Sequence, residues 1–180
     1  MSEVAVSLDY LVTIFMKRLF LVRHAKSDWS TSGMVDISRP LNDRGHRVAP
    51  KMGTLLFEKG VSPELLVSSP AVRAATTAKY FADEIGYPSD NIKLEDAIYG
   101  ASSVSLLKVV NELPDSAKSV MLFGHNPGFS YFAEELSNGR LGNFPTCAVV
   151  CIDFEVDLWS EISMGMGINK WYSYPSQFDF

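Results

Sequence analysis

Short apolar segments bounded by polar residues alternate along this chain with segments in which apolar residues recur every three or four positions. The first pattern is typical of strands buried on both faces of a parallel sheet, and the second of helices with one face against a core. The predicted strands cover residues 18–23, 64–68, 92–95, 118–123, 146–153 and 160–164. The last two are expected to pair as an antiparallel edge. The alternation predicts βαβ units and therefore an α/β fold with a mostly parallel sheet.

Boundary residues indicate where the first two helices begin and end. The first is expected to begin near Asn42 and to end before Gly60. Pro50 should kink it or lie within an irregular early turn. The second is expected to begin at Ser69-Pro70, because serine is a good N-cap and proline suits the first helical position, and to end at Gly86.

Two more helices are predicted further along the chain. One runs from about Ser103 to Leu113, and the other begins with Asn126-Pro127, again a capping residue followed by proline. The strands at 64–68 and 118–123 each lead directly into a helix start. Both helix N-termini should therefore point their unpaired N–H groups at the carboxyl edge of the sheet, where such groups attract phosphate.

Length and composition favour a single globular domain in residues 16–180. A chain of 180 residues with 47% hydrophobic and 21% charged residues can bury a sizeable core. The net charge of −5 argues against broad nucleic-acid binding, although it allows a small cationic pocket. Cys147 and Cys151 lie four positions apart in a predicted strand, too far for an easy disulfide, so we expect buried thiols and a cytoplasmic protein.

Residues 1–15 read as an extension that precedes this domain. A secretory signal requires Lys or Arg near its start, and Ser2 to Phe15 contains neither. A membrane span requires an unbroken apolar segment, and Ser7, Asp9 and Thr13 interrupt the apolar residues here. We therefore expect no membrane segment. Met16 is a second candidate for the native start, and a short amphipathic helix over residues 1–15 is the alternative. The sequence leaves both open.

Four residues with a common chemistry stand at the predicted carboxyl edge of the sheet. Arg23 and His24 follow the first apolar strand, Arg73 lies in the first turn of the second helix, and His125 follows the strand at 118–123. Ligands bind at this edge in open α/β sheets. An arginine can hold a phosphoryl group with two hydrogen bonds, and an imidazole nitrogen can attack phosphorus. Phosphoryl transfer through a phosphohistidine follows as a hypothesis.

Four sequence blocks, in order, resemble the histidine phosphatase superfamily and, within it, the small SixA-like phosphohistidine phosphatases. They span roughly residues 17–175, nearly the whole chain, and each falls at the junction expected for it. The blocks are Leu21-Val-Arg-His-Ala-Lys-Ser27, Arg39-Pro-Leu-Asn-Asp-Arg-Gly45, Val67-Ser-Ser-Pro-Ala-Val-Arg-Ala-Ala-Thr-Thr-Ala78 and Phe123-Gly-His-Asn-Pro-Gly128. The resemblance implies a three-layer α/β/α sandwich of the phosphoglycerate mutase type without a large cap insertion.

The resemblance also implies roles for the four edge residues. His24 is similar to the family's nucleophile, Arg23 and Arg73 to its phosphate-binding arginines, and His125 to a second histidine thought to act protonated. Ala25 stands where the family more often has glycine, a change that adds one methyl group and that the short branch often shares.

Other polar residues are candidates for supporting roles. The general acid could be Glu95, Asp96 or Asp28, since larger relatives supply a carboxylate from the segment after the third strand. Further phosphate contacts are expected from residues on the loops around the nucleophile, namely Lys26, Ser27, Arg39 and Asn126. Lys26 and Ser27 could equally lie on a solvated loop, and Arg39 could instead pair with Asp36 or Asp43.

Competing chemistries lack their sequence signatures. The chain has no P-loop motif, no arginine six positions after either cysteine, and only three histidines, without zinc-site spacing. We therefore expect no metal and no cofactor. The predicted partner is a phosphohistidine-bearing protein or a small phosphoester. A small-molecule phosphomonoesterase and a non-catalytic phosphate-binding module remain alternatives, and a mutase is disfavoured by the missing cap.

Overall fold

Six strands form one mixed sheet in the computed structural model, which describes residues 16–30 and 33–180. The strands are β1 (Lys17–Arg23), β2 (Leu65–Ser68), β3 (Lys93–Leu94), β4 (Ser119–Gly124), β5 (Val149–Phe154) and β6 (Ile168–Ser173). Their order in the sheet is β3-β2-β4-β1-β5-β6. The first four pair in parallel, whereas β5 and β6 are antiparallel to their neighbours. The predicted extension, residues 1–15, lies outside the described residues.

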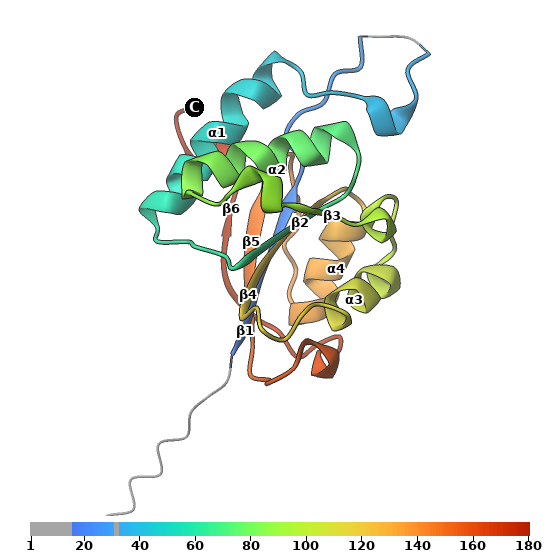
Figure 1. Cartoon of the computed structure of the whole chain (residues 1–180), viewed down its shortest axis with the longest axis vertical. Coiled ribbons are helices and arrows are strands. Elements are labelled where there is room, and N and C mark those ends of the chain that lie inside the picture. Colours follow the sequence, from blue (N-terminus) through green and yellow to red (C-terminus); the bar gives the residue numbers. More distant parts are fainter. Residues whose placement is uncertain (1–15, 31–32) are drawn as a thin grey trace, which may run out of the picture.

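Helices cover both faces of this sheet (Figure 1). They are α1 (Asp43–Glu58), α2 (Val72–Ile85), α3 (Ser103–Asn111) and α4 (Gly128–Ser137). Successive residues of β1 point to opposite faces, as strand geometry requires. Phe20 therefore packs in the core beneath α1 and α2, and Leu19 and Leu21 in the core beneath α3 and α4. The predicted three-layer α/β/α sandwich is confirmed.

Strand register brings three chain segments to one edge of the sheet. Arg23 at the end of β1 pairs with Gly124 at the end of β4, and Ser68 at the end of β2 pairs with Phe123. The residues that follow these strand ends are therefore neighbours in space although they are far apart in the sequence. This is the edge at which the sequence placed its four candidate residues.

The predicted last strand at 160–164 is wrong. Trp159–Glu161 is a 3₁₀ turn, and the sixth strand is instead Ile168–Ser173. Trp159 is buried, and its indole Nε1 donates a hydrogen bond to the carbonyl of Ala117 at 2.8 Å. The apolar residues of this segment thus fill the core as a turn. The edge strand β6 is largely exposed, so its sequence lacks a strong apolar pattern.

Two predicted helix starts also need correction. α2 begins at Val72, two residues after the predicted first helical residue Pro70, and α4 begins at Gly128, one residue after Pro127. The side chains expected to cap them have other partners: Ser69 contacts His125, and Asn126 donates to the carbonyl of Phe144. α1 begins after its predicted N-cap Asn42 and continues through Pro50, so Pro50 does not lie in an irregular early turn.

Two further findings concern the cysteines and the length of the helices. Cys147 and Cys151 are both buried and unbonded to each other. Within residues 16–30 and 33–180, no helix is long and apolar enough to cross a membrane.

Close approach of two chain segments at Gly128 gives a test of this packing. A β-carbon at Gly128 would lie inside van der Waals contact of the Ala101 carbonyl oxygen, which is backbone and cannot easily move. We expect Gly128→Ala to lower the free energy of unfolding by about 1–3 kcal/mol, the usual cost of overpacking. Urea unfolding would measure it. Gly139→Ala is the control, because its β-carbon would meet only the Ser137 side chain and backbone. Equal stability of the two variants would contradict the packing.

Candidate active site

Two histidines lie side by side at the carboxyl edge of the sheet. His24 follows β1 and His125 follows β4, and because these strands are parallel neighbours their imidazole rings lie 5.1 Å apart, centre to centre. Both side chains are buried. The structure thus brings together the two histidines that the sequence singled out.

The tautomer of His24 is set by a backbone hydrogen bond. Its Nδ1 lies 2.7 Å from the carbonyl oxygen of Ala25. A carbonyl oxygen can only accept, so Nδ1 carries the proton and Nε2 carries the lone pair. Burial, together with the charges of Arg73 and Arg23, lowers the pKa of His24 to about 3, although its hydrogen bond to Ala25 opposes this shift. His24 therefore presents a neutral imidazole with a nucleophilic Nε2 at neutral pH.

Arg73 lies beside that nitrogen. Its Nε is 3.3 Å from Nε2 of His24, and its side chain is almost entirely buried. Thr77, one turn further along α2, donates to the carbonyl of Arg73 and accepts from the backbone N–H of Ala25. This pair of hydrogen bonds ties the first turns of α2 to the loop that carries His24.

Asp36 holds the other side of the Arg73 guanidinium. The backbone carbonyl of Asp36 accepts from Nη1 at 2.6 Å, and its carboxylate Oδ2 accepts from Nη2 at 2.8 Å. The same carboxylate accepts hydrogen bonds from the Tyr99 hydroxyl and from Arg39. Partial burial opposes ionisation of Asp36, but the hydrogen bonds from Tyr99 and Arg73 outweigh it and lower the pKa of Asp36 to about 2. Asp36 is therefore a permanent anion among arginines.

His125 contacts the other strand ends. Its Nε2 lies 2.8 Å from the hydroxyl of Ser69, and the edge of its ring meets the ring of Tyr99. Its Nδ1 is buried without a hydrogen-bond partner among the described residues. Burial and the charge of Arg73 lower the pKa of His125 to about 4. Both histidines are thus neutral in the unliganded protein, and the positive charge of the site comes from its arginines.

Arg23 and Asn126 share one anchor on the opposite wall. Arg23 Nη1 and Asn126 Nδ2 both donate to the carbonyl of Phe144, at 2.8 and 2.9 Å. This leaves Arg23 Nε and Asn126 Oδ1 buried without partners in the described part of the chain. The guanidinium of Arg39 stacks over the ring of Trp29 at 3.5 Å and forms an ion pair with Asp36, which is one of the two pairings predicted from the sequence. Arg39 also lines the site, so both of its predicted placements are found. These arginines have hydrogen-bonding capacity to offer an anion.

All these groups surround one cavity of about 460 Å³. Its lining residues are Arg23, His24, Lys26, Ser27, Trp29, Asp36, Arg39, Arg73, Tyr99, Gly100, His125, Asn126 and Thr146. Every residue predicted from the sequence to contact phosphate is in this set. The three carboxylates considered as general acid, Glu95, Asp96 and Asp28, are not. Among the described residues, Asp36 is the one carboxylate that lines the cavity.

Sequence reasoning missed the roles of several residues at the site, of which three matter most: Asp36 and Tyr99, which line the cavity, and Ser69, which contacts His125. Asp36 lies in the long segment between β1 and α1, which has no periodic pattern from which the place of a side chain could be predicted. The sequence analysis considers it only as a possible ion-pair partner of Arg39. Tyr99 lies shortly after Glu95 and Asp96 in the segment that follows the third strand, where the sequence analysis considers carboxylates as general acids and not a tyrosine. Ser69 was interpreted as a helix cap. In the described ranges, no group of three or more His, Cys, Asp or Glu side chains could hold a metal ion.

The lowered pKa values predict how the histidines titrate. We expect the NMR signals of the His24 and His125 rings to titrate well below pH 6.5, near 3 and 4. Because the unfolded chain binds these protons more readily, the free energy of unfolding should fall as the pH drops from about 6.5 towards 4. The double variant His24→Asn, His125→Asn should lose part of this dependence. A midpoint near 6.5 for either ring would contradict the burial described.

The Asp36 carboxylate and a phosphate dianion would compete for the same guanidinium groups. We expect Asp36→Asn to bind inorganic phosphate about fivefold more tightly, because an exposed ion pair contributes up to about 1 kcal/mol. Isothermal titration calorimetry would measure the dissociation constant. Asp90→Asn removes the same charge from an exposed position outside the cavity and should change nothing. Unchanged or weaker phosphate binding by Asp36→Asn would refute the competition.

Comparison with known proteins agrees with this arrangement. Residues 19–98 match the histidine phosphatase superfamily (branch 1). An uncharacterized chloroplastic protein of Arabidopsis thaliana is 28% identical over 168 residues, which cover 88% of this chain and 76% of that protein. The structure assigned as the phosphohistidine phosphatase SixA of Agrobacterium tumefaciens is 26% identical with a TM-score of 0.74, over 88% of this chain and 98% of that one. The structure of the protein histidine phosphatase SixA complexed with tungstate is 23% identical with a TM-score of 0.71, over 89% of this chain and 98% of that one. The chain is therefore similar to the histidine phosphatase superfamily over residues 19–98, and to SixA phosphohistidine phosphatases over nearly its whole length.

Proposed function

We propose that this protein is a phosphatase that works through a phosphohistidine on His24, and that its substrate is phosphohistidine in a protein. The observation that carries the first part is the hydrogen bond from His24 Nδ1 to the carbonyl of Ala25. It leaves Nε2 neutral and unprotonated at a cavity lined by arginines. Without a ligand this lone pair accepts a hydrogen bond from Arg73 Nε at 3.3 Å, and nucleophilic attack on phosphorus requires Arg73 to turn to the phosphoryl oxygens instead.

The reaction takes two steps. In the first, the lone pair of His24 Nε2 forms a bond to phosphorus while the bond to the leaving group breaks and its electron pair goes to that group. In the second, water attacks phosphorus, the P–Nε2 bond breaks with its electron pair returning to His24 Nε2, and the oxygen and both protons of the water leave with the phosphate as dihydrogen phosphate. Arg23 and Arg73 offset the charge on the phosphoryl oxygens throughout. A bound dianion would raise the pKa of His125 and favour the protonated form that contributes to this stabilisation.

The substrate's leaving group is inferred from the lack of a protonated carboxylic acid among the described residues that line the cavity. Asp36 is ionised and engaged with arginines, so it has no proton to give. Glu95, Asp96 and Asp28 do not line the cavity. The alcohol of a phosphoester leaves as an alkoxide unless a nearby acid protonates it, whereas phosphohistidine takes a proton from water on its other ring nitrogen and then releases neutral imidazole. A site without a carboxylic acid therefore suits the P–N bond. Similarity to the Agrobacterium tumefaciens SixA structure supports the same substrate class.

Hydrolysis of matched substrates tests this proposal. We expect the protein, in EDTA, to release phosphate from a phosphohistidine-bearing phosphocarrier protein much faster than from p-nitrophenyl phosphate, and His24→Ala to release none from either. Faster turnover of the small ester would assign the protein to phosphomonoesters instead. Absence of both activities would leave a phosphate-binding module.

Arg73 gives a graded test of the same mechanism. We expect Arg73→Ala to lose about 2–5 kcal/mol of transition-state stabilisation, because truncating one partner of a buried charged contact has costs of this size. The value of kcat/KM on the phosphohistidine substrate would measure the loss. Arg140→Ala, an exposed arginine outside the cavity, should retain the activity. Full activity of Arg73→Ala would rule out the assigned role.

A further inference from the structure

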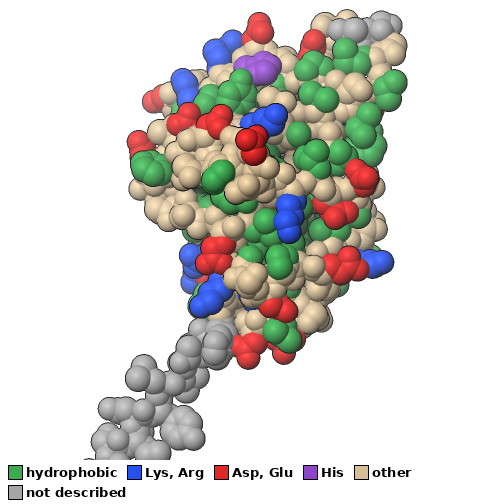
Figure 2. Space-filling model, viewed as in Figure 1, with side chains coloured by type: hydrophobic (Ala, Val, Ile, Leu, Met, Phe, Trp, Pro, Cys, Tyr) green, Lys and Arg blue, Asp and Glu red, His purple; other side chains and the backbone are tan. Residues whose placement is uncertain are grey.

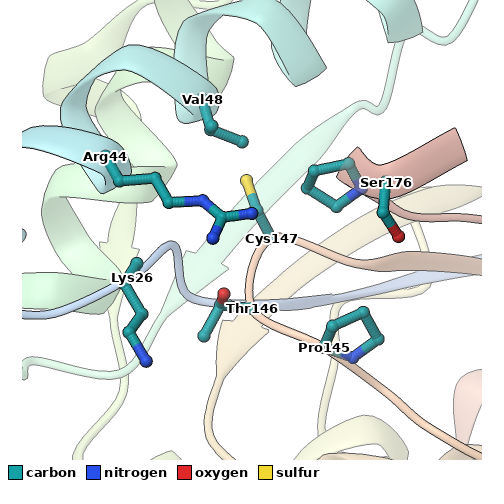
Figure 3. A pocket seen from close by; sticks show the side chains of 8 residues that line it. Lys26, Arg44, Val48, Pro145, Thr146, Cys147 and Ser176 are labelled. Atoms are coloured by element: carbon teal, nitrogen blue, oxygen red, sulfur yellow. The ribbon is translucent and has the colours of Figure 1, made fainter. Parts of the chain in front are cut away.

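A groove leads from the active-site cavity along α1. Lys26 and Thr146 line both the cavity and a smaller hollow of about 60 Å³ next to it. Arg44 lines that hollow and also a third one of about 210 Å³, together with Arg47 and Lys51. Because each hollow shares lining residues with the next, the three lie in a row, which we call the depression. Figure 3 shows Arg44 extending from α1 toward the Thr146-Cys147 segment at its centre.

Four cations line this depression outside the arginines of the active site. We call Lys26, Arg44, Arg47 and Lys51 the basic track. All four side chains belong to exposed residues. In the described ranges none of them forms an ion pair, whereas Arg18, Arg39 and Arg73 each hold a carboxylate. No Asp or Glu lines the two smaller hollows.

Helix geometry gives the track its direction. Positions 44, 47 and 51 lie on one face of α1, and a rise of 1.5 Å per residue separates the first from the last by about 10 Å along the axis. The chain as a whole carries a net charge of −5. On the face shown in Figure 2, basic and acidic side chains are intermixed. A row of unpaired cations beside the active site is therefore a local departure from the charge of the molecule.

Apolar groups accompany the cations. Val48 and Pro175 lie between the hollows, and Phe178 and Phe180 line the outer one. The ring of Phe180 is exposed and also lies 5.7 Å from the Lys51 ammonium. Arginine and aromatic residues are enriched at the contact surfaces of proteins. A mixed basic and aromatic groove thus resembles a protein-binding surface more than a pocket for a single small anion.

We propose that the basic track binds acidic residues that flank the phosphohistidine of a protein substrate. This inference rests on the proposed function and adds the class of substrate sequence that the active site accepts. Glutamate or aspartate side chains next to the phosphorylated histidine would lie over Arg44, Arg47 and Lys51 while the phosphoryl group enters the cavity. A small phosphometabolite would be too short to reach the outer two cations.

Two synthetic phosphohistidine peptides of equal length test this proposal. One carries four glutamates on each side of the phosphohistidine, and the other carries serines in their place. We expect the unaltered protein at low salt to show a kcat/KM about tenfold higher for the glutamate peptide, mainly through a lower KM, since two or three exposed charge contacts add up to this effect. Added salt should reduce the difference.

Charge-reversal variants locate the effect on the track. Arg47→Glu with Lys51→Glu should abolish the preference for the glutamate peptide and leave hydrolysis of the serine peptide unchanged. Lys93→Glu with Lys118→Glu makes the same change in net charge on exposed residues of β3 and of the loop just before β4, away from α1, and should keep the preference.

The outcomes separate this inference from the function on which it rests. Equal kcat/KM for the two peptides, or an unchanged preference in the α1 variant, would overturn the basic track alone. Inhibition by a single-stranded oligonucleotide that depends on Arg47 and Lys51, without any effect of the glutamates, would assign the track to nucleic acid and overturn the proposal. Failure of the unaltered protein to hydrolyse either peptide would overturn the proposed function and this inference with it.

Discussion

Parallel pairing of β1 with β4 is the constraint on which the site depends. The two strands are buried at the centre of the sheet, and their register places Arg23 opposite Gly124. The next residue of each strand is a histidine, so the pairing brings the centres of two imidazole rings to 5.1 Å from each other. A shift by one residue would turn every side chain of β1 to the other face of the sheet. Hydrophobic packing in both cores therefore fixes the geometry of the polar site.

Electrostatics then sets the protonation of those imidazoles. Placing two histidines and three arginines in one buried region would be unfavourable if all were charged. The histidines stay neutral because burial and the neighbouring guanidinium groups lower their pKa values. Asp36 offsets part of the positive charge by pairing with Arg73 and Arg39. The proposed nucleophile, His24, is thus neutral for the same reason that the pocket would attract anions: cations surround it.

Much of this architecture could be predicted from the sequence because it depends on local patterns. The buried strands β1 and β4 have continuous apolar residues. The polar residues that follow them lie at the same carboxyl edge of a parallel sheet, whatever the lengths of the connecting loops. The edge strand β6 could not be found in the same way, since exposure removes the pattern. Asp36 and Tyr99 come from segments without periodicity, and only tertiary packing brings them to Arg73. Ser69 was misassigned because a good capping residue is also a good hydrogen-bond partner, and here His125 is the partner.

Recognition of the phosphoryl group cannot by itself distinguish one substrate from another, since the group is the same in all of them. In the proposed reaction, the arginines and histidines of the cavity act on that common part. Discrimination must then come from the leaving group and from contacts beyond the cavity. Among the described residues no protonated carboxylic acid lines the cavity, which under the proposed mechanism favours leaving groups that depart without one. The exposed ring of Trp29 at the cavity and the cations along α1 offer contacts to the molecule that carries the phosphoryl group. Under the proposed mechanism, chemistry and selectivity would therefore be carried by different residues, and each could change without the other.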